Sequence, residues 1–147
     1  MTAPFTSTKT YRNLPCAHRQ WRHEGHCAWI HGYSRSFTFV FACTELDANH
    51  FVMDFGALRK VKEWLEHMFD HTLLICADDP ELETFEALHQ RGLCSLRVLP
   101  NVSMEATSKY VFDHVQPLID TATDGRVWIL SVECRENDKN SAVYTPA

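Results

Sequence analysis

The sequence predicts an α+β fold, in which an antiparallel sheet carries two main helices on one face. Strand-like runs come in pairs that are joined by short turns, which is typical of antiparallel hairpins. Two long amphipathic segments separate these pairs, and each needs a sheet face on which to bury its apolar stripe. With 147 residues, of which 45% are hydrophobic, the chain is long enough for one domain with a real core.

The first third of the chain carries little periodicity. Residues Met1 to Thr10 are polar, and we expect them to be loosely ordered. Lys9 to Pro15 could form a short strand. The stretch from Cys16 to Gly32 combines Cys, His, Trp and Gly without a clear period, which favours a loop that holds functional side chains.

A strong strand signal follows from Ser34 to Thr44. Its aromatic side chains alternate at Phe37, Phe39 and Phe41, and the intervening residues are also largely apolar. Such a strand suits a sheet that is covered on both faces. After a short turn, His50 to Phe55 is predicted to form the second strand of a hairpin.

The middle of the chain is mainly helical. Gly56 to Phe69 is predicted to be an amphipathic helix whose apolar stripe packs on the core. A short helix is expected from Asp79 to about Gln90, where Gly92 provides a stop. Leu93 to Leu99 is predicted to form a short strand that ends at Pro100.

The last third predicts one more helix and a hairpin. Ser103 is expected to cap a helix that runs to about Asp120, with Glu105 in its first turn. A long strand from Arg126 to Glu136 and a final strand from Ser141 to Thr145 complete the pattern.

Composition argues against several classes of protein. The net charge is -5 and no Lys/Arg block occurs, so a nucleic-acid footprint is not supported. No apolar run approaches the roughly 18 to 20 residues that span a bilayer. The first ten residues lack the apolar core of a secretory signal, and we expect a cytoplasmic protein. The six cysteines form no C-x-x-C pair, so a zinc ribbon is not expected. Because a reducing compartment is expected, disulfides are not expected either.

The histidines are the unusual feature of the early loop. Four of them, His18, His23, His26 and His31, fall within fourteen residues. Imidazole is a preferred zinc ligand, and a catalytic zinc usually has three protein ligands. The spacing matches no standard short zinc motif, so a metal site and a solvated His-rich loop remain equally open.

Other reactive residues have ordinary explanations by themselves. Cys27 is either an inert structural cysteine or, near a cation, a base or nucleophile. Asp70 and His71 place a carboxylate next to an imidazole, although neighbours in sequence need not face each other. Glu105 and Glu136 would normally be surface acids.

In their order and spacing, however, these pieces resemble the 6-pyruvoyl/6-carboxy-tetrahydropterin synthase family from Tyr11 to Tyr144. The pieces are C-A-H-R-Q at 16–20, E-G-H-C at 24–27, H-G-Y-S at 31–34, V-M-D-F-G-A-L at 52–58, F-D-H-T-L at 69–73, S-M-E at 103–105 and E-N-D-K-N-S-A-V-Y at 136–144.

The resemblance implies the tunnelling fold, a four-stranded antiparallel sheet with two helices on one side. Subunits of this family join their sheet edges into a barrel, commonly as trimers that stack into hexamers. The chain would then be a single domain over residues 1–147, and residues 76–101 are interpreted as an insertion. Joined edges would also leave no strand edge exposed.

The resemblance also implies a set of site residues. His18 and His31 match zinc ligands, and Cys27 matches the catalytic cysteine. Asp70 and His71 match the Asp-His pair that works with this cysteine. Of the acids, Glu136 matches the one that anchors the pterin ring, and Glu105 matches a second acid near the substrate.

One position departs from the family pattern. Tyr33 stands where the family has the second His of H-G-H. A phenol is a poor zinc ligand at neutral pH, because it must first lose a proton. Three alternatives are open: Tyr33 binds as a phenolate, His23 or His26 provides the third nitrogen, or zinc binding is weakened.

The implied activity is a zinc-dependent conversion of 7,8-dihydroneopterin triphosphate. The E-G-H-C stretch is more similar to the branch that forms 6-carboxy-tetrahydropterin with acetaldehyde and triphosphate, a step towards queuosine, and we predict this product. The alternatives are a 6-pyruvoyl product, an aldolase-like cleavage, and a non-catalytic paralogue that binds a pterin or purine.

Overall fold

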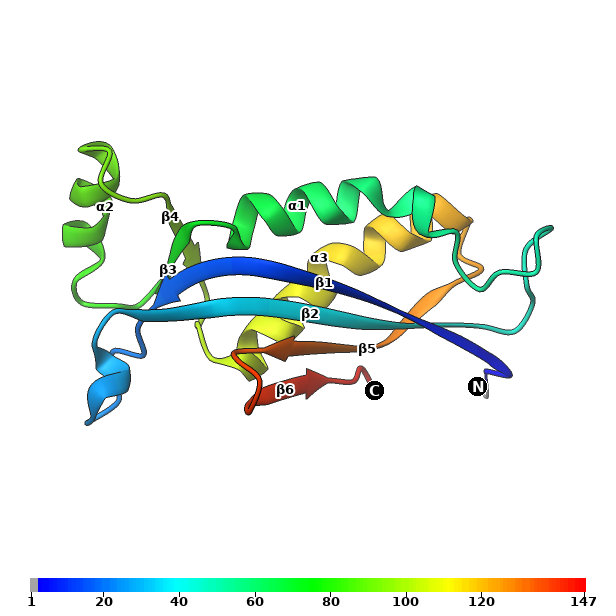
Figure 1. Cartoon of the computed structure of the whole chain (residues 1–147), viewed down its shortest axis with the longest axis horizontal. Coiled ribbons are helices and arrows are strands. Elements are labelled where there is room, and N and C mark those ends of the chain that lie inside the picture. Colours follow the sequence, from blue (N-terminus) through cyan, green and yellow to red (C-terminus); the bar gives the residue numbers. More distant parts are fainter. Residues whose placement is uncertain (1–2) are drawn as a thin grey trace.

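The computed structural model describes residues 3–147, which form one mixed β-sheet with helices packed on it (Figure 1). None of the described helices has both the length and the apolarity to cross a membrane. The strands are β1 (Phe5–His18), β2 (His31–Cys43), β3 (Thr72–Cys76), β4 (Leu96–Leu99), β5 (Trp128–Arg135) and β6 (Ser141–Tyr144). The helices are α1 (Arg59–Phe69), α2 (Leu82–Gln90) and α3 (Met104–Thr123), with 3-10 turns η1 (His26–Ala28) and η2 (Phe55–Leu58).

The sheet has the strand order β4-β3-β1-β2-β5-β6. The pairs β1–β2, β2–β5 and β5–β6 are antiparallel, whereas β3 joins β1 and β4 joins β3 in parallel. The α+β class is therefore confirmed. The predicted strand count is corrected from four to six, because two parallel strands extend the four antiparallel ones.

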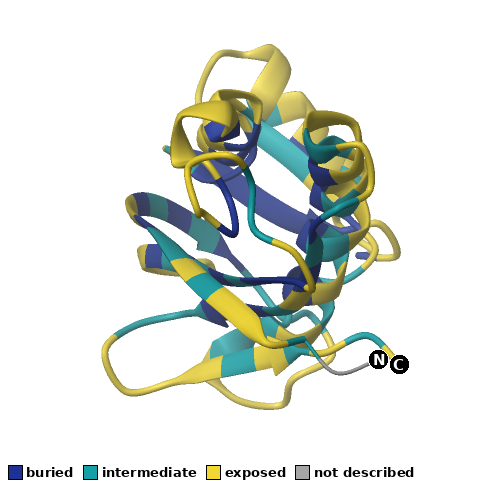
Figure 2. Ribbon diagram, turned by 90° about the vertical axis from the view of Figure 1, so that its right-hand side faces the viewer, coloured by how far each residue is buried: buried dark blue, intermediate teal, exposed yellow. Residues whose placement is uncertain are grey.

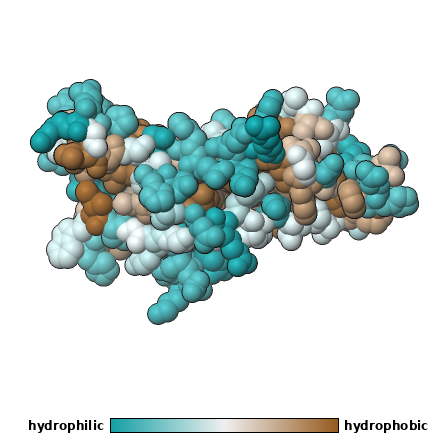
Figure 3. Space-filling view, turned by 45° about the horizontal axis from the view of Figure 1, so that its top comes forward, coloured by the Kyte–Doolittle hydropathy of each residue, from teal (hydrophilic) through white to brown (hydrophobic). Residues whose placement is uncertain are grey.

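The main core lies between the helix layer of α1 and α3 and one face of the sheet (Figure 2). Phe37, Phe39 and Phe41 of β2 are fully buried there, as their alternation predicted. Leu65 of α1 and Val111 of α3 are fully buried in the same core. The outward faces of the helices are mostly hydrophilic (Figure 3), as expected for amphipathic helices that bury one stripe.

The helix starts follow from local hydrogen bonds. The Asp54 carboxylate accepts from the Gly56 N–H and begins η2, which leads directly into α1. The Ser103 hydroxyl accepts from the Ala106 N–H at 3.0 Å, so the predicted cap of α3 is confirmed. This cap fixes where α3 begins, and with it the position of Glu105 in the first turn.

β1 changes its register with β2 at a β-bulge. Tyr11 pairs with Phe37 but Leu14 pairs with Arg35, so β1 advances three residues where β2 advances two. Inside the bulge, Asn13 has a φ of 62°, in the left-handed region. Asparagine tolerates this region better than most residues, which explains how the chain accommodates the extra residue here.

The bulge decides which side chains of β1 face the helix layer. Side chains alternate along a strand, so without the bulge Pro15 and Ala17 would follow Tyr11 onto the core face. The extra residue reverses this alternation, and Cys16 and His18 are the buried residues instead. His18 therefore points to the same side as the helices.

β3 is an element that the sequence pattern did not predict. All five of its residues are buried, because the strand is covered on both faces. Leu74 and Cys76 belong to the main core, while Leu73 and Ile75 pack against Phe85 of α2 in a second cluster. Alternation of apolar and polar residues is the signal that identifies a half-exposed strand. The continuous apolar run of β3 lacks this signal.

Two other expectations about the chain are wrong. Residues 50–54 form a loop rather than a strand, and β2 forms its hairpin with β1. In this loop the Asp47 carboxylate accepts from the N–H groups of Asn49 and Phe51, which turns the chain away from the sheet. The predicted disorder of Met1–Thr10 is wrong from Phe5 onward, where β1 begins. Met1 and Thr2 lie outside the described residues.

Gly32 allows the close approach of β1 and β2 at the end of the hairpin. A Cβ at this position would lie 2.3 Å from the Cys16 carbonyl oxygen. We predict that Gly32→Ala pushes the strands apart and lowers the free energy of unfolding by about 1–3 kcal/mol, as overpacking usually does. Denaturant unfolding measures this change.

Gly56→Ala is the matched control for this substitution. Its added Cβ would meet only the Asp54 side chain at 3.2 Å, which can move. A Gly32→Ala protein that is as stable as the Gly56→Ala protein would contradict the prediction.

Candidate functional site

A cavity of about 250 Å³ opens where the β1–β2 hairpin extends beyond the start of α3. Its walls come from the end of β1, from the start of β2 and from the residue that follows β5. Five of the residues that the sequence analysis selected line it together: His18, Cys27, His31, Glu105 and Glu136.

The strand pair delivers the two imidazoles. His18, the last residue of β1, pairs directly with His31, the first residue of β2. Their ring centroids are 4.5 Å apart. Glu136 follows β5 immediately, and its N–H donates to the Asn140 carbonyl in the turn before β6. This turn holds the carboxylate over the two rings.

Three donor atoms converge as a result. Glu136 Oε1 lies 3.6 Å from His18 Nε2 and 4.0 Å from His31 Nε2. One ligand atom from each of the three residues lies within 4.8 Å of the other two. Among residues 3–147 this is the one group of three or more His, Cys, Asp or Glu side chains that could hold a metal ion.

The donor set fits a divalent transition metal. Zinc is bound by His nitrogen and carboxylate oxygen at about 2.0–2.2 Å in tetrahedral geometry, which places ligand atoms about 3.3 Å apart. The two contacts of Glu136 are slightly longer than this separation, so small side-chain rotations would close them around an ion. Two His and one carboxylate also leave the fourth position open, as catalytic sites require.

The charge state of His18 agrees with this role. Its side chain is buried, and burial is the main reason that its pKa is lowered to about 3. The neighbouring Arg35 and His31 lower the pKa further. His18 is therefore a neutral imidazole at pH 7, the form that binds metals.

Arg35 opposes metal binding at the same residue. It is only 2% exposed, and one guanidinium nitrogen lies 3.1 Å from His18 Nδ1. A guanidinium can only donate, so Nδ1 accepts and the imidazole proton resides on Nε2, facing Glu136. A metal-bound histidine normally donates from its second nitrogen. Binding through Nε2 would therefore require Arg35 to release Nδ1.

None of the three side chains considered as the third ligand, Tyr33, His23 and His26, belongs to this donor group. Tyr33 is 48% exposed, and its ring is 6.3 Å from that of His31. His26 is exposed in η1. His23 lines the cavity, but its Nδ1 accepts from the Gly25 N–H at 2.9 Å and so holds the loop together. The carboxylate of Glu136, by contrast, lies within 4.8 Å of the ligand atoms of both His18 and His31.

Cys27 is half-buried in η1, at the wall of the cavity. Its carbonyl accepts from the Gln20 N–H at 2.9 Å, which closes the loop between β1 and β2. The half-buried Cys27 differs in its exposure from Cys43 and Cys134, which are fully buried. Burial raises the pKa of Cys134 to about 12 and leaves it a small hydrophobic side chain, as expected.

Asp70 and His71 lie elsewhere in the chain. They contact each other, with His71 Nδ1 2.6 Å from an Asp70 carboxylate oxygen. The His71 N–H donates to the Pro15 carbonyl, and its φ of 59° makes the tight turn from α1 into β3. Neither residue lines the cavity of Cys27, and the His71 side chain is 83% exposed.

Sequence reasoning missed two features of the site. The first is Arg35, which is buried against His18 although it stands in an apolar strand. The metal-facing position of Glu136 depends on the turn between β5 and β6, whose geometry is a tertiary property. A lone Arg within an otherwise apolar core stripe was the available signal for the first feature.

Comparison with known proteins gives a consistent result. A family model described as 6-pyruvoyl tetrahydropterin synthase matches residues 7–147. The 6-carboxy-5,6,7,8-tetrahydropterin synthase of Bacillus subtilis is 28% identical over 122 residues, which cover 83% of this chain and 72% of that protein. A protein of the same name from Rickettsia felis is 33% identical over 66 residues, 44% of this chain. This chain spans about half the length of that relative, 48%.

Solved structures with the same fold cover nearly the whole chain. A protein of Wolinella succinogenes has a TM-score of 0.84 at 20% identity, with 97% of this chain and 98% of that chain covered. The 6-pyruvoyltetrahydropterin synthase of Plasmodium vivax has a TM-score of 0.65 at 13% identity, with 95% and 97% covered. At these identities the likeness shows the fold alone.

We predict that Arg35→Gln strengthens metal binding. Glutamine removes the buried charge and offers a carbonyl that can accept from His18 Nδ1–H, which frees Nε2 for the metal. Because second-shell partners commonly change metal affinity about 10–100-fold, we expect Zn²⁺ to bind at least about 10-fold more tightly. Competition with a chromophoric chelator measures this affinity.

Arg22→Gln is the matched control, since Arg22 lies in the loop between β1 and β2 and is largely exposed. A folded Arg35→Gln protein whose zinc affinity equals that of the control would show that Arg35 does not oppose the metal.

Proposed function

The chain belongs to the 6-pyruvoyl tetrahydropterin synthase family, and we propose that it is a zinc-dependent pterin enzyme. Its proposed reaction converts 7,8-dihydroneopterin triphosphate and water into 6-carboxy-5,6,7,8-tetrahydropterin, acetaldehyde and triphosphate. The named relatives from Bacillus and Rickettsia support the carboxy product. The observation that carries the proposal is the meeting of three imidazoles, two carboxylates and a thiol in one cavity.

We propose that His18, His31 and Glu136 hold the zinc ion. When bound, the ion supplies Lewis acidity towards the hydroxyls of the substrate side chain. The resemblance assigns Glu136 to the pterin ring, but its distances to both imidazoles support the metal role. Glu105 is then the acid in the cavity that remains free to accept hydrogen bonds from the pterin N–H groups.

Cys27 is the proposed base. Its thiolate would accept a proton from a carbon of the substrate side chain, and its place on the cavity wall gives it access. A protein that only binds pterins needs no such group. The thiol therefore supports an enzyme over a binding protein.

We propose that Asp70 and His71 act on the Cys27 cavity of another copy of the chain. Asp70 orients the exposed imidazole through the 2.6 Å contact, a suitable arrangement for a proton shuttle. β3 pairs with β1 only at Cys16–His18, and the Pro15 carbonyl accepts from the His71 N–H. Within residues 3–147, β1 therefore presents a free edge from Phe5 to Leu14. Pairing of such edges between copies is the proposed route to a trimer or hexamer.

A second candidate function is a non-catalytic pterin-binding paralogue. Arg35 favours it, because its contact with His18 opposes the metal, and Tyr33 favours it, because it replaces a family ligand. Glu105 and Glu136 could still hold the amino-pyrimidine edge of a pterin in such a protein. Zinc content close to one per chain distinguishes the enzyme from this alternative.

We predict that the zinc-loaded protein converts 7,8-dihydroneopterin triphosphate to the carboxy product, as identified by mass spectrometry. Cys27→Ala and His71→Ala should each lose most of the activity, by at least about 100-fold for a general acid or base. If the site is shared between copies, mixing the two inactive variants under conditions of subunit exchange restores part of the activity.

Each outcome of this experiment has a distinct meaning. A 6-pyruvoyl product, or cleavage without loss of triphosphate, would overturn the assigned reaction but not the site. No turnover in the presence of bound zinc would reject the enzyme. No recovery on mixing, with subunit exchange verified, would show that the site is not shared between copies.

A further inference from the structure

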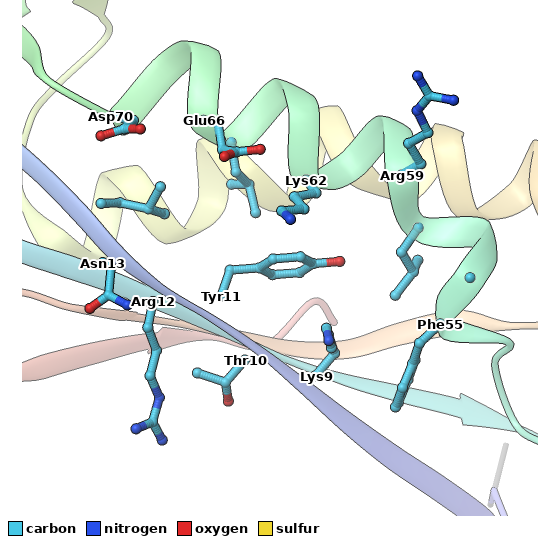
Figure 4. A pocket seen from close by; sticks show the side chains of 14 residues that line it. Lys9, Thr10, Tyr11, Arg12, Asn13, Phe55, Arg59, Lys62, Glu66 and Asp70 are labelled. Carbon is cyan, nitrogen blue, oxygen red and sulfur yellow. The ribbon is translucent and has the colours of Figure 1, made fainter.

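A second cavity, of about 560 Å³, lies between the first half of β1 and the start of α1 (Figure 4). Its floor comes from residues 9–14 of β1, and its other wall comes from η2 and from one face of α1. It shares no lining residue with the cavity of His18 and Cys27. This second cavity is called the β1–α1 cavity below.

The β1–α1 cavity is rich in cations, although the chain as a whole carries a net charge of -5. Lys9, Arg12, Arg59 and Lys62 line it. Arg59 is paired with Glu63 at 2.7 Å, outside the cavity. The other three have no hydrogen bond or ion pair from their side chains among residues 3–147.

The four cations are not equally placed. In Figure 4 the ammonium groups of Lys9 and Lys62 lie on either side of the Tyr11 hydroxyl, whereas the guanidinium groups of Arg12 and Arg59 extend outward at the rim. The Lys9 ammonium is 5.6 Å from the centre of the Tyr11 ring and 5.5 Å from that of Phe55. Two fixed positive charges therefore flank one hydroxyl.

Tyr11 gives a second indication, independent of the cations, that the β1–α1 cavity binds a ligand. The residue is only 9% exposed, and its hydroxyl is a buried polar atom without a hydrogen-bond partner. Buried hydroxyls are nearly always paired, so this one requires an acceptor that the chain itself does not provide. Burial raises its pKa to about 12, and the group is therefore a proton donor at neutral pH.

We propose that the β1–α1 cavity binds a polyphosphate group, with Lys9, Lys62 and the Tyr11 hydroxyl donating to its oxygens. Phosphate oxygens are strong acceptors, and lysine binds them as a compact point charge. Arg12 and Arg59 point away from the lysines and add only longer-range positive charge at the rim (Figure 4). Asp70 lies at the opposite end of the cavity and Glu66 lies between it and Lys62, so their negative charge restricts an anion to the lysine end (Figure 4).

The polyphosphate could be free or could be the tail of a small organic molecule. The Phe55 ring beside Lys9 offers an apolar face for an aromatic group attached to such a tail. The binding chemistry at the lysines is the same in both cases, and it does not depend on the reaction proposed above.

The test is calorimetric titration of the metal-free protein with inorganic tripolyphosphate, since the metal would itself bind this anion. We expect wild-type binding that weakens with salt, because the contacts are electrostatic. The double substitution Lys9→Gln and Lys62→Gln should weaken binding at least 10-fold. Tyr11→Phe, which keeps the ring and removes only the donor, should weaken it severalfold.

Lys60→Gln is the matched control, because Lys60 is an exposed residue of α1 that does not line the cavity. The proposal is overturned if wild type shows no binding at millimolar tripolyphosphate, or if the double variant binds as well as the control. Because Tyr11→Phe preserves shape and charge, its result also stands if the double variant fails to fold.

Two further titrations distinguish free polyphosphate from the tail of an organic molecule. They also separate the proposed polyphosphate site from the proposed enzyme function. If 7,8-dihydroneopterin triphosphate binds 10-fold more tightly than tripolyphosphate, and Phe55→Ala removes this gain, the occupant is the tail of an aromatic molecule. Equal affinities identify free polyphosphate, and both results support the site. His18→Ala should leave tripolyphosphate binding unchanged, so failure of the proposed enzyme function does not affect this outcome.

Discussion

The pairing of β1 with β2 is the constraint on which the candidate site depends. An ordinary hairpin with unbroken alternation would turn His18 away from the helix layer, on the opposite side of the sheet from His31. The bulge at Arg12–Asn13 adds one residue and reverses the alternation, so both imidazoles reach the same face. Gly32 then lets the strands approach closely beside the pair. The backbone of one hairpin thus positions two of the three candidate metal ligands.

The same hairpin carries an electrostatic conflict. It buries Arg35 against His18, and one guanidinium nitrogen, Nη1, has no partner among the described residues. A buried cation with incomplete hydrogen bonding is costly, and it also repels a second cation in the adjacent cavity. A metal ion and the ring N–H of His18 would compete for the nearby carboxylate of Glu136. Whether this cavity works as a metal site depends on which of these interactions is stronger.

Residue patterns predicted the helices well, because α1 and α3 have a strong apolar period and α3 has a clear cap at Ser103. They did not predict β3, which is buried on both faces, or the bulge, which depends on a left-handed Asn13. Family resemblance selected five residues that line one cavity, but it did not predict that Glu136 lies beside the two imidazoles. That position is decided by the turn between β5 and β6, and the direction of a side chain within a turn leaves no periodic signal in the sequence.

X-ray absorption at the zinc edge of the zinc-loaded protein tests the central claim most directly. The account predicts two imidazole nitrogens and one carboxylate oxygen from the chain, at about 2.0–2.2 Å, with no sulfur ligand. The oxygen contribution should change when Glu136 is replaced by glutamine and remain when Glu133 is replaced instead. A sulfur ligand at about 2.3 Å would place Cys27 on the metal, and three imidazoles would return the third position to a histidine of the loop. Either result would contradict the account.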